Sequence, residues 1–155
     1  MIYEKEHKIN NTISLDEISL NYLNDIYNYS NDTEFCKYLS FKPSLENTKI
    51  FIENTITDIY NKKRLYWVIK YDDKIIGTIG LLNFNRNLSS AEIGFGISKL
   101  YWGKGIINKC LDYLIYYSFY DLGIVSLNIG TNINNNRAIN FIKNIILQKI
   151  RNAKI

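Results

Sequence analysis

One segment constrains the fold of this chain more than any other: a strand, a turn with two glycines and a helix follow one another without a break. Residues 91–98 alternate in polarity, which predicts a strand with Ile93, Phe95 and Ile97 on one side and Glu92, Gly94, Gly96 and Ser98 on the other. The turn contains Gly103-Lys104-Gly105. The helix after it repeats its apolar residues at the helical period (Ile107, Cys110, Leu111, Leu114, Ile115 and Phe119).

This turn has the features of a phosphate-binding site. A helix N-terminus presents unpaired backbone N–H groups and the positive end of the helix dipole, and glycines before it let the backbone approach an anion closely. Lys104 adds a positive charge. The turn is not a Walker loop, and it is not a complete dinucleotide fingerprint because Asn108 stands where the third glycine would fall. The glycines at 94 and 96 leave room for a ligand against the strand, although a bulge or sharp twist explains them equally.

The rest of the chain predicts an α+β fold with a mixed, mostly antiparallel central sheet flanked by helices. A capping-box pattern at residues 14–17 predicts a first helix with Leu15, Ile18, Tyr22, Ile26 and Tyr29 on one face. A second helix is expected over residues 45–61, with Phe51, Ile52, Ile56 and Ile59 inward, then a hairpin of 65–71 and 75–83, a strand at 125–129, a last helix from Ala138 to Ile145 and a short strand at 147–155. The sequence shows neither a repeat nor a linker, which predicts one domain over residues 1–155.

The inventory of reactive residues excludes several chemistries. The one histidine, His7, lies near an end that we expect to be frayed, which argues against a zinc site and a Ser-His-Asp hydrolase. Cys36 and Cys110 are expected to be buried free thiols rather than a disulfide. The sequence has neither a secretory pattern at its start nor a run of about 20 apolar residues, so we expect a cytoplasmic protein without a membrane contact.

Positive charge is concentrated in the second half of the chain. The net charge is +4, and residues 99–155 carry eight Lys or Arg against two Asp, whereas residues 1–98 are net acidic. This distribution suits an anionic ligand and also weak nucleic-acid binding. Because no dense Lys/Arg cluster occurs, a small anionic ligand is the favoured interpretation over nucleic acid.

Two of these segments together resemble a known family. Residues 91–98 (AEIGFGIS), followed by Tyr-Trp-Gly-Lys-Gly-Ile at 101–106, resemble the cofactor-binding core of the GNAT superfamily of N-acetyltransferases, and more closely its RimJ/RimL-like branch, which acetylates the N-termini of ribosomal proteins. Residues 27–32, the hairpin at 66–69 and 76–80, and residues 135–139 are similar to further motifs of that branch in the same order. The resemblance runs from about residue 13 to residue 147.

The resemblance implies acetyl-CoA as co-substrate and names the residues that would hold it. Backbone groups of Ile97 and Ser98 would bind the pantetheine arm as an additional strand. Asn135 would reach the cofactor from the start of the last helix, although capping of that helix is an equal alternative. Trp102, Gly103, Lys104, Gly105 and Ile106 would form the rest of the cofactor site, with the pyrophosphate on Gly103 to Ile106.

The same resemblance implies direct transfer of an acetyl group to an amine, either a protein N-terminus or a small molecule. Glu92 is the candidate general base, and an ordinary solvated carboxylate is its alternative. The position at which many relatives carry a tyrosine acid is Ile142, and the sequence ends about where the family continues into a final strand hairpin. These departures support a second hypothesis, a degenerate acyl-CoA-binding module without catalysis. An exposed sheet edge left by the short C-terminus would predict a homodimer.

Overall fold

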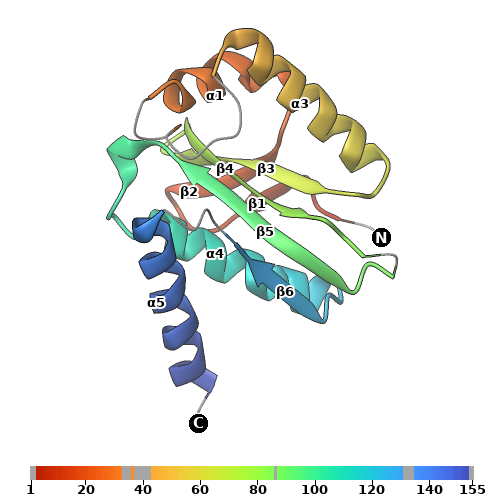
Figure 1. The fold of residues 1–155 in the computed structure, drawn as a ribbon, viewed down its shortest axis with the longest axis vertical. Helices are drawn as coiled ribbons and strands as arrows, with labels where there is room; N and C mark the ends of the chain where they lie inside the picture. The colour runs from red at the N-terminus through yellow and green to blue at the C-terminus, as the bar shows by residue number, and fades with distance from the viewer. Residues whose placement is uncertain (1–2, 33–35, 37–42, 86, 131–134, 154–155) are drawn as a thin grey trace.

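The computed structural model describes residues 3–32, 36, 43–85, 87–130 and 135–153, without the side chains of 145–153. Within this part of the chain six strands form one sheet in sequence order (Figure 1). Neighbouring strands are antiparallel except the last two, which run parallel, so the predicted mixed sheet is confirmed. The strands are β1 (Glu6–Lys8), β2 (Ile13–Glu17), β3 (Leu65–Tyr71), β4 (Lys74–Leu82), β5 (Ser90–Ile97) and β6 (Ser126–Ile129), and the helices are α1 (Leu23–Ser30), α3 (Leu45–Tyr60), α4 (Ile106–Tyr116) and α5 (Asn136–Ala153).

The capping-box prediction at residues 14–17 is wrong, because these residues belong to strand β2. Ile13 and Leu15 are buried and alternate with half-buried Ser14 and Asp16, as the two-residue period of a strand requires. The whole of β2 pairs with β3. The helix begins later, at Leu23, after a single 3-10 turn that Ser19 caps by accepting a hydrogen bond from the Asn21 backbone N–H. Tertiary pairing therefore outweighs the local capping signal.

The second helix and the hairpin are confirmed. Ser44 caps α3 by accepting a hydrogen bond from the Asn47 N–H at 2.9 Å, and Ile52 and Ile59 are buried. Ile56 is exposed instead of inward. Tyr71 pairs with Lys74 across a two-residue turn, in which Asp72 and Asp73 both have positive φ, as the tight hairpin turn that matches strand twist requires.

The segment 91–129 forms a β-α-β unit as its pattern predicts. Strand β5 leads through a short 3-10 turn, Lys99–Tyr101, into α4, and a π-helical turn, Tyr117–Asp121, then leads to β6. Two parallel neighbouring strands need a crossover connection, here a helix, because the end of the first strand and the start of the second lie at opposite ends of the strands. Helix α4 therefore covers one face of the sheet, while α1 and α3 cover the other (Figure 1).

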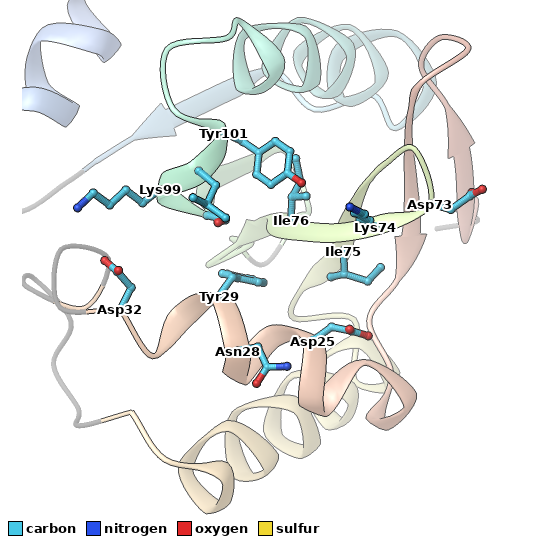
Figure 2. Close-up of a pocket in the computed structure, with 12 residues that line it drawn as sticks. Asp25, Asn28, Tyr29, Asp32, Asp73, Lys74, Ile75, Ile76, Lys99 and Tyr101 are labelled. Carbon is cyan, nitrogen blue, oxygen red and sulfur yellow. The ribbon is translucent and has the colours of Figure 1, made fainter.

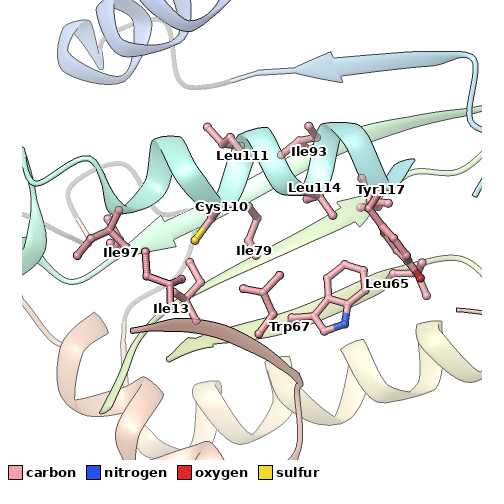
Figure 3. Close-up of a cluster of buried hydrophobic side chains, with 14 of the residues drawn as sticks. Ile13, Leu65, Trp67, Ile79, Ile93, Ile97, Cys110, Leu111, Leu114 and Tyr117 are labelled. Atoms are coloured by element: carbon pink, nitrogen blue, oxygen red, sulfur yellow. The ribbon is translucent and has the colours of Figure 1, made fainter. Parts of the chain in front are cut away.

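The larger core lies between the sheet and α4 (Figure 3). Trp67 and Ile79 from the central strands meet Leu111 and Leu114 from the helix, and all four side chains are fully buried or nearly so. A smaller core on the opposite face joins Ile26 of α1 and the α3 side chains to β3. Two apolar faces of one sheet thus produce a three-layer arrangement of helix, sheet and helix.

His7 does not lie on a frayed end, which corrects the expectation for the N-terminus. It belongs to β1, the residue is 4% exposed, and its ring lies edge-on to Trp67 and Tyr117. Nε2 must carry the proton because its partner, the Glu4 carbonyl oxygen at 3.0 Å, only accepts. Nδ1 then accepts from the Tyr113 hydroxyl at 2.8 Å. Burial lowers the pKa of His7 below its ordinary value.

The predicted final strand at 147–155 is also wrong, since α5 continues to Ala153. The sequence from Asn136 to the end contains neither Gly nor Pro, so nothing local stops the helix. Figure 1 shows the second half of α5 extending away from the sheet. No helix in the described ranges is long and apolar enough to span a membrane.

Candidate functional site

Strand β5 is paired along most of its length on one side and along half of it on the other. Toward β4 the pairing runs from Glu92 to Ile97, whereas toward β6 it runs from Ser90 to Ile93. Within the described residues, β6 therefore separates from β5 after Ile93. The second half of β5 has an edge that can accept a further extended chain.

The register identifies the backbone groups at this edge. Ser98 N–H donates to the Ile76 carbonyl of β4 at 2.7 Å, so in the alternating pattern of an antiparallel pair the backbone groups of Ile97 and Phe95 point away from β4. The Ile97 carbonyl is already used within the protein, because it accepts a hydrogen bond from Trp102 Nε1 at 3.0 Å. Of the two backbones predicted to hold pantetheine, Ile97 thus faces the open edge and the Ser98 N–H does not.

The turn after β5 has the geometry that its two glycines predict. Gly103 and Gly105 have φ of 74° and 75°, a region that residues with a Cβ avoid. Apart from its chain neighbours, a Cβ added at either glycine would meet no atom of the described residues within 4 Å, so these positions face open space within that part of the chain. Gly105 is the N-cap of α4 and no side chain caps this helix, which begins with buried Ile106. The N-terminal N–H groups of α4 therefore remain available to an anion.

Two aromatic residues before the turn each carry a cation on their ring. Lys104 Nζ lies 5.5 Å from the centroid of the Tyr101 ring, and the Arg137 guanidinium lies 3.8 Å from that of Trp102. Arg137 comes from the first turn of α5 and was missed by the sequence interpretation. The sequence places Arg137 within the Asn-Asn-Arg-Ala-Ile motif at 135–139, but this motif does not reveal that its guanidinium lies on Trp102.

Glu92 lies at the point where β5 and β6 separate. Its Oε2 accepts a hydrogen bond from Asn83 Nδ2 at 2.8 Å. A Cβ on Gly130, the residue that follows β6, would lie 3.6 Å from Glu92 Oε1. The half-buried Glu92 carboxylate thus lies where the open part of β5 begins, and the turn with Gly103 and Gly105 follows the other end of this open part.

Asn135 directly precedes α5 and Ile142 lies within it, and both bear on the predicted cofactor contact and the predicted acid. Asn135 caps the helix, because its Oδ1 accepts from the Ala138 N–H at 3.1 Å. This supports the capping alternative, and contact with a cofactor stays a prediction. Ile142, at the position where the resemblance implies a tyrosine acid, is buried with 9% exposure. Phe141 packs on Phe95 with ring centroids 6.0 Å apart, which brings α5 against the open part of β5.

The strand glycines are partly covered by the protein's own side chains. A Cβ at Gly94 would lie 2.8 Å from a Leu82 methyl group, and one at Gly80 would lie 2.3 Å from the Tyr66 ring. Close packing of neighbouring side chains therefore explains these two glycines. The pairing of β4 with β5 runs through Gly94 without a register shift, so a bulge is not the reason for this glycine, and room for a ligand beside it stays a prediction.

A cavity of about 680 Å³ lies on the α1 side of the site (Figure 2). It is lined by α1, the start of β4 and the segment from Ser98 to Tyr101, with the carboxylates of Asp25, Asp32 and Asp73 and the ammonium groups of Lys74 and Lys99 around it. Glu92 does not line it. Because Glu92 and Ser98 lie six residues apart on an extended strand, roughly 20 Å separate them. The acceptor loop predicted around residues 38–41 lies outside the described residues.

Cys110 is not a nucleophile. It is fully buried in the α4 core, and burial raises the pKa of its thiol to about 12. Both cysteines are free thiols, although Cys36 is only half-buried. The burial and raised pKa of Cys110 therefore argue against a covalent acyl-enzyme at this residue.

Comparisons with known proteins agree with this geometry. The uncharacterized N-acetyltransferase p20 of Bacillus licheniformis is 26% identical over 125 residues, which cover 78% of this chain and 70% of that protein. The structure of the microcin C7 self-immunity acetyltransferase MccE, in complex with acetyl-CoA and AMP, has a TM-score of 0.74 at 26% identity and covers 84% of this chain and 76% of that chain. RimL, a ribosomal L7/L12 alpha-N-protein acetyltransferase in complex with coenzyme A, has a TM-score of 0.78 at 16% identity, covers 87% and 78%, and shares the fold.

A family model described as an acetyltransferase (GNAT) domain matches residues 13–145, which is most of the sequence. The match includes β5, the glycine turn and α4, the elements that form the open edge and the uncapped helix N-terminus. The chain belongs to the GNAT acetyltransferase family.

Proposed function

We propose that this protein is an N-acetyltransferase that moves an acetyl group from acetyl-CoA to a primary amine by direct attack. The observation that carries the proposal is the continuous path from Glu92, along the open edge of β5, to the uncapped N-terminus of α4. An acyl carrier with a long neutral arm and a phosphorylated end fits a site with these two ends. Acetyl-CoA would supply the acetyl group as an activated thioester.

The residues present fit such a carrier. The N–H and C=O groups of Phe95 and the N–H of Ile97 point to the open side of β5, where an amide-containing chain can pair with them. Gly103 and Gly105 face open space, and Lys104 lies in the turn between them, which suits a pyrophosphate. Trp102 anchors the turn to β5 through its hydrogen bond to the Ile97 carbonyl, and buried Ile106 anchors it to the core at the start of α4.

Glu92 acts as the general base in this proposal. Most amine acceptors are protonated at neutral pH, so a proton must leave the nitrogen before it attacks a carbonyl carbon. The Asn83 side chain orients one carboxylate oxygen and leaves Oε1 without a donor among the described residues. The arrangement at Cys110 favours direct attack over a thioester on the protein.

A three-part assay tests the proposal. A thermal-shift measurement with acetyl-CoA tests binding, release of free CoA in the presence of amines tests turnover, and mass spectrometry identifies the acetylated product. We expect stabilisation by acetyl-CoA and release of CoA with at least one class of acceptor, a peptide N-terminus or a small amine. Absence of any shift with acetyl-CoA would refute the proposal.

A degenerate acyl-CoA-binding module is the second candidate function. The observation that favours it is that Ile142, where the resemblance implies a tyrosine acid, is a buried apolar side chain without a hydroxyl group. Such a protein would be stabilised by acetyl-CoA and would release no CoA with any amine. The two candidates therefore differ in turnover and agree in binding.

We also propose that the protein forms a homodimer. Strand β6 is the last strand of the sheet within the described residues, and Val125 just before it is 77% exposed. An uncovered sheet edge favours pairing with another chain. Size-exclusion chromatography with light scattering should show a dimer, and a clean monomer at high concentration would contradict this proposal.

A further inference from the structure

The indole of Trp102 is fixed at the end of β5. Its Nε1–H donates to the Ile97 carbonyl at 3.0 Å, and its backbone N–H donates to the Lys99 carbonyl at 3.2 Å. The residue directly precedes Gly103, the first glycine of the phosphate turn. Two hydrogen bonds to the protein thus hold a flat aromatic surface beside this turn.

Arg137 lies on that surface. Its guanidinium carbon is 3.8 Å from the centroid of the Trp102 ring, well within the roughly 6 Å at which a cation and an aromatic face attract each other. Guanidinium is planar, so a stacked arginine keeps its N–H donors pointing outward in the plane of the group. The contact joins the first turn of α5 to the end of β5.

No carboxylate of the described residues pairs with Arg137. The ion pairs in the described part of the chain involve other residues, namely Lys49 with Glu53, Arg64 with Asp58 and Lys70 with Asp16. Arg137 is exposed, as is Lys104 on the other side of Trp102. Two cations that no described carboxylate compensates therefore flank the turn, and each one lies on an aromatic ring.

We infer that Arg137 binds a phosphate group of the CoA and that Trp102 is the residue that positions it. The inference rests on the proposed function and goes beyond it, because neither glycines nor Lys104 account for a ligand that carries a pyrophosphate and a separate 3′-phosphate. An arginine already held in place loses little side-chain freedom on binding. Its guanidinium donates bidentate hydrogen bonds to phosphate, which a lysine cannot do.

Calorimetric titration with three ligands tests this inference. Acetyl-CoA carries all the phosphates, the dephospho form lacks the 3′-phosphate, and S-acetylpantetheine lacks them all. For Arg137→Gln we expect the Kd of acetyl-CoA to rise about tenfold, as loss of a charge-assisted hydrogen bond predicts. The Kd of S-acetylpantetheine should not change. A loss with acetyl-CoA alone places Arg137 at the 3′-phosphate, and a loss with both nucleotide ligands places it at the pyrophosphate.

Three further variants separate positioning from charge. Trp102→Leu should raise the Kd of acetyl-CoA nearly as much as Arg137→Gln, and the double variant should be no worse than the more affected single one. Arg137→Lys should recover part of the affinity. Lys143→Gln removes an exposed charge from the same helix, six residues further on, and should leave every Kd unchanged. Unfolding temperatures of all variants report whether the fold is intact.

The outcomes that overturn the inference are distinct from failure of the proposed function. If the wild-type protein binds no acetyl-CoA, the proposed function fails. If the wild type binds and Arg137→Gln binds equally well, or if the variant also loses affinity for S-acetylpantetheine, the phosphate role of Arg137 is wrong. Full additivity of the Trp102 and Arg137 substitutions would overturn the positioning role of the tryptophan.

Discussion

Replacement of Gly105 by alanine separates backbone strain from cofactor binding. Gly105 has φ of 75°, and a Cβ there would meet no protein atom within 4 Å. The substitution therefore introduces no clash within the protein. It forces an L-residue into the left-handed region and places a methyl group in the space in front of the α4 N-terminus.

The expected loss of stability follows from two opposing terms. Left-handed backbone costs a residue with a Cβ roughly 1–2 kcal/mol. Alanine also reduces the freedom of the unfolded chain, which offsets about 0.4–1 kcal/mol. The net destabilisation should be about 1 kcal/mol, or a fall in Tm of about 3 °C for a chain of this size.

Gly123→Ala provides a matched control. Gly123 has φ of 73° and an equally open Cβ position, but it follows the π-helical turn at the opposite end of α4. Both variants should lose the same stability in urea unfolding. In calorimetric titration, only Gly105→Ala should lose affinity for acetyl-CoA, by at least about tenfold or 1.4 kcal/mol.

Two results would refute this reasoning. Equal acetyl-CoA affinity in the two variants would show that the Gly105 turn does not approach the cofactor. Unchanged stability in Gly123→Ala would show that the positive φ is not strained for alanine. Gly105→Asn provides an additional check on strain, because asparagine tolerates the left-handed region and should lose less stability than alanine.

Three further predictions concern catalysis, pH and the core. Glu92→Gln should lower kcat about 100-fold or more and leave the Kd of acetyl-CoA unchanged, and loss of both to the same degree would assign Glu92 to binding. Burial lowers the pKa of His7 in the folded protein, so the unfolded chain binds this proton more readily and the free energy of unfolding should fall as pH drops below about 6.5. Urea unfolding at pH 7.5 and 5.5 should show a smaller fall in His7→Gln, and an identical fall would contradict this role. Leu111→Ala, at a side chain that is 0% exposed, should cost about 2–5 kcal/mol, whereas Lys109→Ala on the exposed face should cost less than about 0.5 kcal/mol by the same measurement.

Local sequence patterns were sufficient wherever one segment determines its own conformation. The alternation at residues 91–98, the helical period after Gly105 and the hairpin at Asp72 and Asp73 each appear in the structure where the sequence predicts them. Gly103 and Gly105 have positive φ because the chain must turn sharply between β5 and α4. These same residues carried the resemblance to the GNAT family, which the family model confirms.

Contacts between distant segments decided the rest. The segment at 13–17 is a strand because β3 pairs with it, and this pairing outweighs its capping box. His7 is buried because Trp67 and Tyr113 cover its ring, and both residues are remote from it in the sequence.

The functional site divides in the same way. The sequence alone determined the turn at Gly103 and Gly105, since glycine conformation and the helix N-terminus are properties of a few consecutive residues. Only the tertiary structure showed that β6 leaves the edge of β5 after Ile93, that Glu92 stands where the two strands separate, and that Arg137 lies on Trp102. Each of these features joins segments that are remote in the chain, and their proximity depends on the packing of the whole sheet against α4 and α5.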